Sequence, residues 1–389
     1  MVWYRVHART LPWRGVADPY KTWLSEIMLQ QTRVATVIDH YLRFLERFPS
    51  LVALALAPEE DVLAQWSGLG YYRRARMLHK AAQFVIRERG GIFPSTADEL
   101  RTLPGIGEYT SAAVASIAFG ESVAAVDGNV ERVLLRLTGR AEDPTAAARA
   151  FIRDIANNLV PGRVMDTASR SIHSRSIHGR VVKTNAAGDH NQAMMELGAT
   201  ICLPRSPLCL QCPVYDLCKT RGEHPTPERP RLRSREVAYL LSIRKRRTIT
   251  HVLLTRRPPD VSLMPDMYEL PPLSLNLAAD YMTDREPILR LRHAITNTNY
   301  YVHVYTPRGP GDRSLRQAVP LAARDLLWVR TATLGELPLT GLARKILERL
   351  DVMALRPVRV LPAEEPILPP PTRTRRSAPI DWDDDPETF

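Results

Sequence analysis

The stretch Leu103-Pro-Gly-Ile-Gly-Glu-Tyr-Thr110 decides how this chain folds. Residues 97–103 suit a short helix that ends at Pro104, and a second helix, rich in Ala and Ser, begins at Thr110. Gly105 and Gly107 form the tight turn between them. Glycines at these two places let backbone N–H groups face outward at a helix N-terminus, where they can hold a phosphate group. An ordinary corner between two helices is the alternative, so other signals must decide.

The charge balance favours a polyanionic partner. The 389 residues include 53 Lys and Arg against 42 Asp and Glu, a formal charge of +11. Because residues 361–389 are acidic, the remainder carries 50 basic against 35 acidic residues. No apolar run approaches the roughly 20 residues that span a bilayer, and the first residues have no secretory apolar region. We therefore expect a cytoplasmic protein that contacts nucleic acid and no membrane.

Residues 1 to about 161 predict a mainly helical domain. Asp18-Pro19 is a helix start signal, and apolar residues then recur at helical spacing through Trp23-Leu-Ser-Glu-Ile-Met-Leu-Gln-Gln-Thr32. Short turns with Pro or Gly separate the further predicted helices, at 34–47, 59–66, 72–89, 97–103, 110–118, 128–137 and 145–158.

Residues 162–190 are polar and basic. They contain a near-duplicated pentad, Arg170-Ser-Ile-His-Ser174 and Arg175-Ser-Ile-His-Gly179. We interpret this segment as a surface insertion, either a tolerated flexible loop or an extra loop that contacts DNA. Helical pattern resumes at Asn191-Gln-Ala-Met-Met-Glu-Leu-Gly198.

A second, α+β domain is expected after a Pro- and Arg-rich linker. Alternation predicts strands at 237–243, 249–255 and 300–305, with 244–247 as a hairpin turn, and helices at 283–290 and 338–350. The expected organisation is a first domain at 1–218, a linker at 219–235, a second domain at 236–355 and a disordered tail at 356–389.

All four cysteines lie close together in the chain, as Cys202, Cys209, Cys212 and Cys218. A cytosolic chain does not favour disulfides, so a metal centre explains the clustering better. The gaps of six, two and five residues suit neither two zinc knuckles nor the usual ferredoxin run. We expect a [4Fe–4S] cluster that presents Arg205, in the first gap, to DNA; a structural zinc site is the alternative.

Together these motifs resemble the endonuclease III superfamily of helix-hairpin-helix DNA glycosylases. The hairpin, Asp127 about twenty residues later and the cysteine spacing C-x6-C-x2-C-x5-C carry the resemblance. Three stretches are similar to the MutY branch of adenine glycosylases: residues 23–32, Gly68-Leu-Gly-Tyr-Tyr-Arg-Arg-Ala-Arg76 and residues 191–198. The resemblance covers nearly all of 3–218 outside the insertion, and more weakly 236–350.

The resemblance implies a monomeric, monofunctional glycosylase that removes adenine mispaired with 8-oxoguanine or G from double-stranded DNA, in base excision repair. Such cleavage needs a proton for the leaving base and negative charge beside the sugar as it becomes an oxocarbenium ion. The resemblance places the acid at Glu26, which protonates adenine N7, and the second carboxylate at Asp127. Because Glu26 lies in an apolar stretch, desolvation is expected to raise its pKa. A solvated helix face for Glu26 and a simple turn for Asp127 are the alternatives.

Position 109 distinguishes two subclasses. Bifunctional members carry a Lys there, whose amine forms a Schiff base that leads to strand cleavage. This chain has Tyr109, so the resemblance implies that Tyr109 and Asn129 support Asp127 and that the product is an abasic site. Packing within the hairpin is the alternative role for Tyr109.

The resemblance also assigns the residues that extrude the base from the duplex and bind it. The base must leave the duplex before an acid can reach it. The positions that fill or wedge the stack are Gln30, Gln31 and Tyr71, and those that line the adenine pocket are Arg14 and Glu196. A helix surface for the glutamines and a core position for the tyrosine are the alternatives.

The second domain resembles the MutY C-terminal module, which is related to Nudix hydrolases and reads 8-oxoguanine. Met267-Tyr-Glu-Leu-Pro271 matches its signature, and the chain has no Glu-rich Nudix box, so nucleotide hydrolysis is not expected. Where many members have Phe-Ser-His, this chain has Ile295-Thr296-Asn297. Thr296 offers a hydroxyl and Asn297 an amide toward the oxidised base.

Two rival functions remain. One is a bifunctional or differently specific glycosylase of the same superfamily, against which Tyr109 argues. The other is a catalytically silent iron–sulfur protein that binds mismatched DNA, against which the presence of both Glu26 and Asp127 argues.

Overall fold

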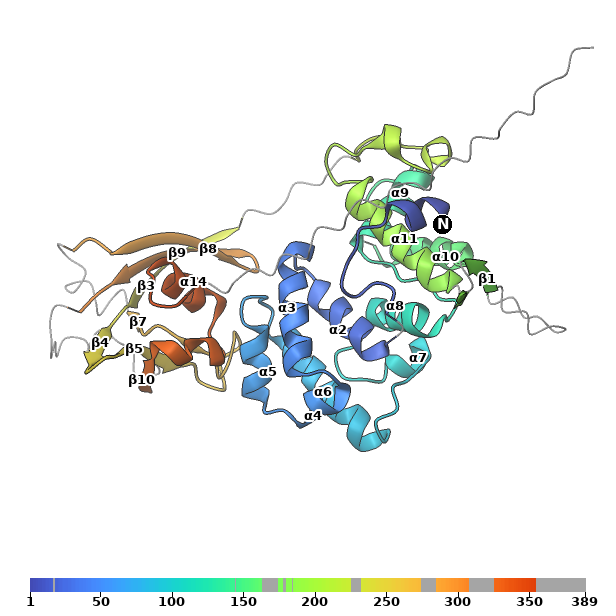
Figure 1. Ribbon diagram of the computed structural model, residues 1–389. Coiled ribbons are helices and arrows are strands. Elements are labelled where there is room, and N and C mark those ends of the chain that lie inside the picture. Colours follow the sequence, from blue (N-terminus) through green and yellow to red (C-terminus); the bar gives the residue numbers. More distant parts are fainter. Residues whose placement is uncertain are drawn as a thin grey trace, which may run out of the picture. The chain divides into compact units, whose positions relative to one another are not determined.

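The computed structural model describes residues 1–16, 18–143, 145–162, 185–224, 232–273, 285–307 and 325–354, together with the backbone of 174–177 and 180–183. Residues Met1–Leu355 belong to one unit. Its first part is helical and its second part contains sheets (Figure 1). No helix in the described ranges is long and apolar enough to cross a membrane. The predicted tail lies outside the described residues.

The helical part follows the predicted order closely. Its helices are α1 (Val2–His7), α2 (Pro19–Leu29), α3 (Val34–Arg47), α4 (Leu51–Leu56), α5 (Glu59–Trp66), α6 (Arg73–Glu88), α7 (Ala97–Leu100), α8 (Glu108–Phe119), α9 (Gly128–Thr138), α10 (Ala146–Leu159) and α11 (Ala186–Thr200). Helices α1 and α4 were not predicted, because six residues are too few to show a helical period.

Helix α2 is the buried centre of this part. Asp18 caps it by accepting hydrogen bonds from the backbone N–H groups of Tyr20 (3.0 Å) and Lys21 (3.3 Å), and Pro19 occupies the first turn. Its residues from Thr22 to Met28 are all buried. The helix packs against α3, α6 and α8, so a polar group within residues 22–28 is largely shielded from water.

The predicted hairpin is α7, the glycine turn and α8. Helix α7 ends at Leu100 and not at residue 103, because the chain bends through turns before Pro104. Gly105 has a left-handed backbone (φ +75°), and a Cβ there would lie 2.4 Å from Met77 Cβ. This position therefore requires glycine for two reasons, backbone conformation and close approach. Gly107 is the N-cap of α8.

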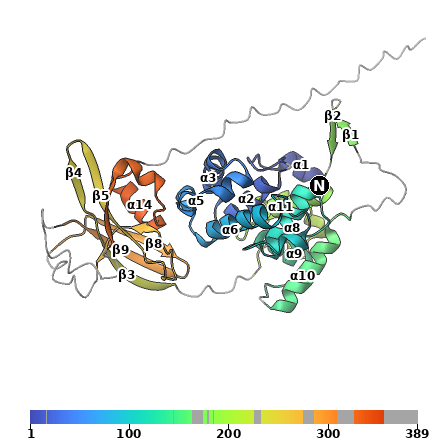
Figure 2. The ribbon, with the colours of Figure 1, turned by 90° about the horizontal axis from the view of Figure 1, so that it is seen from below.

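The predicted insertion is shorter than expected. Helix α11 begins at Ala186, because Asn185 caps it by accepting from the N–H of Gly188 (2.8 Å) and also donates to the carbonyl oxygen of Ser116 (2.7 Å) in α8. The last residues of the predicted insertion are therefore helical. Within it, strands β1 (Ser174–Ile177) and β2 (Arg180–Lys183) pair antiparallel (Figure 2).

The second part holds two sheets. Their strands are β3 (Arg233–Leu240), β4 (Ile243–Arg246), β5 (Ile249–Arg256), β6 (Tyr268–Glu269), β7 (Pro272–Leu273), β8 (Leu289–Ile295), β9 (Thr298–Tyr305) and β10 (Leu326–Arg330). One sheet has the order β10-β5-β4 with β6 on β5, and the other has the order β7-β3-β9-β8, in which β3 and β9 are parallel.

Two local predictions in this part are wrong. The predicted turn at 244–247 is mostly strand β4, and the chain turns at Arg247, whose φ is +54°. The predicted helix at 283–290 is absent from its described residues, 285–290, where β8 begins instead and pairs with β9. Cross-strand pairing overrode a weak local preference in both places.

Helix α14 (Gly341–Arg349) packs in the core of the sheet part through Leu342, Ile346 and Leu347. Just before it, the carbonyl oxygen of Leu339 accepts hydrogen bonds from Tyr72 Oη (2.9 Å) and Ser67 Oγ (3.1 Å) of the helical part.

Candidate functional site

One cleft gathers the predicted acid and its partners. It has a volume of about 1740 Å³ and is lined by α2, the hairpin turn, the start of α8 and the segment before α9. Glu26, Tyr109, Asp127 and Asn129 all lie on its wall. Residues about a hundred positions apart in the sequence therefore face one space.

Glu26 is a buried acid held by a tyrosine. It is 6% exposed, and Tyr109 Oη donates a hydrogen bond to Glu26 Oε2 at 2.5 Å. Burial raises the pKa of Glu26 to about 7; the charge of Asp127 acts in the same direction, and the tyrosine bond and Arg14 act against it. Burial also raises the pKa of Tyr109 well above its ordinary value, so the phenol stays neutral. Glu26 can therefore hold or release a proton near neutral pH.

Asp127 is the N-cap of α9. Its Oδ1 accepts from the backbone N–H groups of Asn129 (2.9 Å) and Val130 (2.8 Å), and its Oδ2 accepts from the side-chain amide of Asn129 (2.7 Å). The positive end of the helix dipole points at the same carboxylate. This carboxylate is thus fixed in place at the cleft wall.

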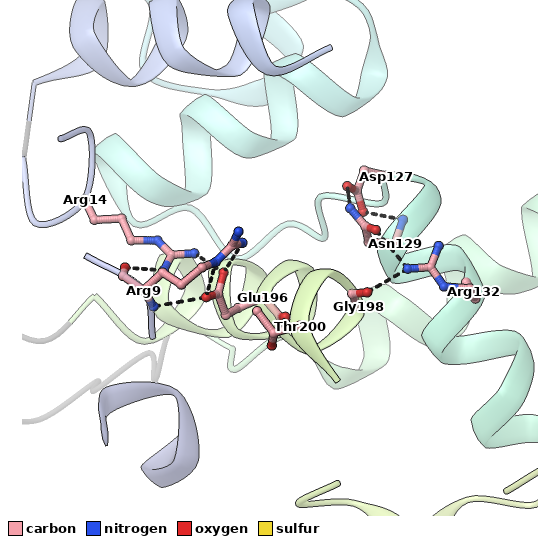
Figure 3. A network of polar contacts seen from close by, with 8 residues as sticks. All are labelled: Arg9, Arg14, Asp127, Asn129, Arg132, Glu196, Gly198 and Thr200. Atoms are coloured by element: carbon pink, nitrogen blue, oxygen red, sulfur yellow. Dashed lines mark hydrogen bonds and ion pairs between the residues drawn. The ribbon is translucent and has the colours of Figure 1, made fainter. Parts of the chain in front are cut away.

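Asn129 is itself positioned by a residue that the sequence reading missed. Arg132 Nη2 donates to Asn129 Oδ1 (2.9 Å) and to the carbonyl oxygen of Gly198 (2.7 Å), and Arg132 Nε donates to the carbonyl oxygen of Cys202 (2.9 Å). Figure 3 shows the guanidinium group of Arg132 beside Asn129 and Gly198. No motif or spacing marks this arginine in the sequence.

Glu196 carries a second buried carboxylate. Arg9 donates to both of its oxygens (2.8 Å each), and Arg14 donates to Oε2 (2.6 Å), as Figure 3 shows. Although burial opposes ionisation, the bonds from Arg9 and Arg14 lower the pKa of Glu196 to about 2. Arg14 and Glu196 were predicted from the sequence, whereas no sequence signal marks Arg9. None of the three lines the cleft, although the charge of Arg14 reaches Glu26.

The predicted wedge residues Gln30, Gln31 and Tyr71 line the cleft. Gln30 Nε2 donates to Thr110 Oγ1 at 3.1 Å, across to the start of α8. Gln31 (φ +54°) and Tyr71 (φ +49°) both have left-handed backbones, and Tyr71 is 49% exposed. An exposed aromatic ring beside a buried acid is a surface on which a base can stack.

In the sheet part, Thr296 and Asn297 form the two-residue turn between β8 and β9. Thr296 lines the same cleft as Glu26, whereas Asn297 is exposed outside it. Arg205 is also exposed, in the cysteine segment.

The four cysteines have free thiols and surround the short helices η1 (Cys209–Gln211) and η2 (Tyr215–Leu217). Burial raises the pKa values of Cys209 and Cys212, and the charges of Cys202 and Cys218 act in the same direction on both. Arg136 Nη1 lies 3.3 Å from Cys202 Sγ, and the N–H of Arg221 donates to Cys218 Sγ at 3.4 Å. N–H donors aimed at sulfur atoms suit a thiolate-ligated iron–sulfur cluster. No three His, Cys, Asp or Glu groups in the described residues converge to hold a single metal ion.

Comparison with known proteins agrees with this geometry. Residues 24–157 match the sequence model of the HhH-GPD superfamily base excision DNA repair protein. This region is therefore similar in sequence to that DNA-repair superfamily. Residues 202–218 match the iron–sulfur binding domain of endonuclease III, which confirms the predicted [4Fe–4S] cofactor. The two matches lie on the hairpin with its following Asp127 and on the cysteine segment.

Curated relatives and a solved structure are also similar to this chain. The adenine DNA glycosylase of Mus musculus is 45% identical over 226 residues, which are 56% of this chain and 40% of that protein. The adenine DNA glycosylase of Arabidopsis thaliana is 34% identical over 330 residues, 74% of this chain and 48% of that protein. A thermostable thymine-DNA glycosylase is 28% identical with a TM-score of 0.48, over 57% of this chain and 92% of that one. The chain spans less than half the length of the two curated relatives.

Proposed function

We propose that this chain is a monofunctional DNA glycosylase that hydrolyses the N-glycosidic bond of adenine mispaired with 8-oxoguanine or G. The observation that carries the proposal is the buried Glu26, with a pKa of about 7, bonded to Tyr109 in the cleft that also holds Asp127. The names of the curated relatives support adenine as the leaving base.

The first step releases the base. The Glu26 carboxylic acid donates its proton to N7 of an adenine that has left the duplex. The bond between C1′ and N9 breaks, and its electron pair leaves with the adenine. The sugar becomes an oxocarbenium ion, and the Asp127 carboxylate stabilises it at C1′. Asn129 holds Asp127 in this position (2.7 Å).

The second step consumes water. A water molecule adds to C1′ and gives a proton back to the Glu26 carboxylate, which restores the acid. The product is an abasic site. Tyr109 stands where an amine would be needed for a Schiff base, so the DNA strand stays intact.

The remaining site residues bind and shape the substrate. We propose that Arg14 and the ionised Glu196 contribute to the adenine pocket from outside the lining of the cleft, where the charge of Arg14 still reaches Glu26. Gln30, Gln31 and Tyr71 line the cleft and occupy the stack that the base leaves. Gly105 and Gly107 hold a DNA phosphate at the start of α8.

The other regions complete the contact with double-stranded DNA. Cys202, Cys209, Cys212 and Cys218 hold the cluster, which fixes the loop that carries Arg205 beside the backbone. Residues 236–355 form a Nudix-like module that reads 8-oxoguanine through Thr296 and Asn297. We propose that the chain acts as a monomer, with its first domain at 1–218 and a linker at 219–235.

Single-turnover excision tests the proposal. Matched duplexes carry A opposite 8-oxoguanine, A opposite G or A opposite T, and each is analysed with and without hot alkali. Adenine release from the two mispairs, with strand breaks only after alkali, is the expected result. Strand breaks without alkali would show a lyase, and tight binding without release would show a catalytically silent protein.

A further inference from the structure

Arg74 lies in the first turn of α6, and its side chain reaches the C-terminal end of α2. Its Nη1 donates to the carbonyl oxygens of Ile27 (2.8 Å) and Met28 (3.2 Å), and also to that of Gln30. The last carbonyl groups of a helix have no partners within the helix, and a cation there also meets the negative end of the helix dipole. Arg74 therefore caps the helix that carries Glu26.

The other terminal nitrogen of Arg74 contacts a different loop. Nη2 donates to Thr32 Oγ1 (3.2 Å), to the carbonyl oxygen of Gly70 (3.3 Å) and, weakly, to that of Leu69 (3.5 Å). One guanidinium group thus joins the chain after α2 to the chain before α6. These segments are almost forty residues apart in the sequence and carry Gln31 and Tyr71, respectively.

Two aromatic rings lie close to the guanidinium group of Arg74. The guanidinium carbon of Arg74 lies 5.5 Å from the Trp66 ring centroid and 5.4 Å from that of Tyr71. Trp66 Nε1 donates to the same Gly70 carbonyl at 3.1 Å. Burial lowers the pKa of Arg74 to about 10, so the side chain stays charged at neutral pH.

Gln31 and Tyr71, which are adjacent in the chain to hydrogen-bond acceptors of Arg74, have strained backbones. Gln31 and Tyr71 have φ values of +54° and +49°, a region that costs an ordinary residue roughly 1 kcal/mol or more. Such conformations persist only when the surroundings hold them. The hydrogen bonds of Arg74 lie next to both residues in the chain.

We propose that Arg74 is a positioning residue that sets Gln31 and Tyr71 as one rigid wedge before DNA arrives. This inference rests on the proposed base-extruding glycosylase function, and it adds the residue that prepares the wedge. Lysine cannot replace it, because the three donors of an ammonium group radiate from one nitrogen, whereas the planar guanidinium reaches acceptors in both loops through separate nitrogens.

The wedge acts on the stacked duplex and not on the bond to be broken. Loss of Arg74 therefore slows the escape of a stacked adenine and leaves the chemistry at Glu26 intact. A change remote from the reacting atoms that displaces the substrate by about 1 Å can slow a reaction about 100-fold. We therefore expect the loss of Arg74 to slow excision of a stacked adenine by about 10- to 100-fold.

The test compares Arg74→Lys with Arg87→Lys, an exposed arginine near the other end of α6. One substrate is a duplex with a single A opposite 8-oxoguanine. The second has mismatched pairs on both sides of that adenine, so that it is already unstacked. In a third, 2-aminopurine replaces the adenine, and its fluorescence rises when the base leaves the stack.

Arg74→Lys should slow single-turnover excision of the stacked adenine by about 10- to 100-fold and should reduce the fluorescence rise of the stacked 2-aminopurine. It should excise the unstacked adenine at close to the wild-type rate. Arg87→Lys should match wild type throughout. Equal loss on stacked and unstacked substrates, or no loss on either, would overturn the inference. Thr32→Val, which removes one acceptor of Arg74, should show the same pattern more weakly if Arg74→Lys does not fold.

The fluorescence rise needs no catalysis. If the wild-type protein raised the fluorescence but released no adenine, the proposed function would fail, and the comparison of Arg74→Lys with wild type would still test the wedge.

Discussion

Replacing Tyr109 with Phe removes the 2.5 Å hydrogen bond to Glu26 Oε2 and leaves the aromatic ring in place. That bond favours the ionised carboxylate, so its loss raises the pKa of Glu26, which is about 7 in the intact site. A hydrogen bond to a charged group contributes about 1.5–3 kcal/mol. The pKa of Glu26 should therefore rise by about 1 to 2 in Tyr109→Phe.

The assay is the single-turnover rate of adenine release as a function of pH, with enzyme in excess. Only protonated Glu26 can donate to the base, so the wild-type rate falls as pH rises through about 7. In Tyr109→Phe the pH at which the rate has fallen to half of its maximum should be higher than in wild type, even if the maximal rate itself differs. Tyr20→Phe is the control, because Tyr20 Oη is a buried donor outside the cleft (2.8 Å to the Phe48 carbonyl). A midpoint that stays unchanged or moves down in Tyr109→Phe would refute the reasoning.

Three further predictions concern the fold around the site. The pKa of Glu26 is raised from 4.5 to about 7. The contribution of Glu26 to the free energy of unfolding is therefore complete below pH 4.5, and about 3 kcal/mol of it is lost as pH rises through 7. Urea unfolding should show this loss in wild type and not in Glu26→Gln. A Cβ on Gly198 would lie 2.6 Å from Asn129 Cβ, so Gly198→Ala should unfold about 1–3 kcal/mol more easily, whereas Gly335→Ala, with open space, should not. Wild-type protein should contain about four iron and four sulfide per chain and Cys209→Ser should lose most of both; stoichiometric zinc in wild type would contradict the cluster.

The amino-acid sequence was sufficient where a signal lies in a short stretch of chain. Asp18 and Pro19 mark the start of α2, because a cap and a first-turn proline act on the adjacent backbone. The left-handed turn at Gly105 (φ +75°) and the spacing of the cysteines are local in the same way. The helix predicted at 283–290 was wrong, because β8 begins at Leu289 and its partner β9 supplies the hydrogen bonds that a local pattern does not show.

Tertiary structure alone brought the supporting arginines to the site. Arg9 meets Glu196 across 187 positions of the chain, Arg74 meets the end of α2, and Arg132 meets the carbonyl of Cys202. Contacts between distant segments follow no fixed spacing, so a sequence pattern cannot reveal them.

The pKa of Glu26 was likewise decided by the fold. Its apolar neighbours in the sequence indicate the direction of the shift, but the value of about 7 depends on how completely the other helices exclude water and on where Tyr109 and Asp127 lie. The sequence by itself determined which acid, which turn and which thiols are present. Folding determined that the acid is buried, because burial is a property of everything packed around a residue and not of the residue's own stretch of chain.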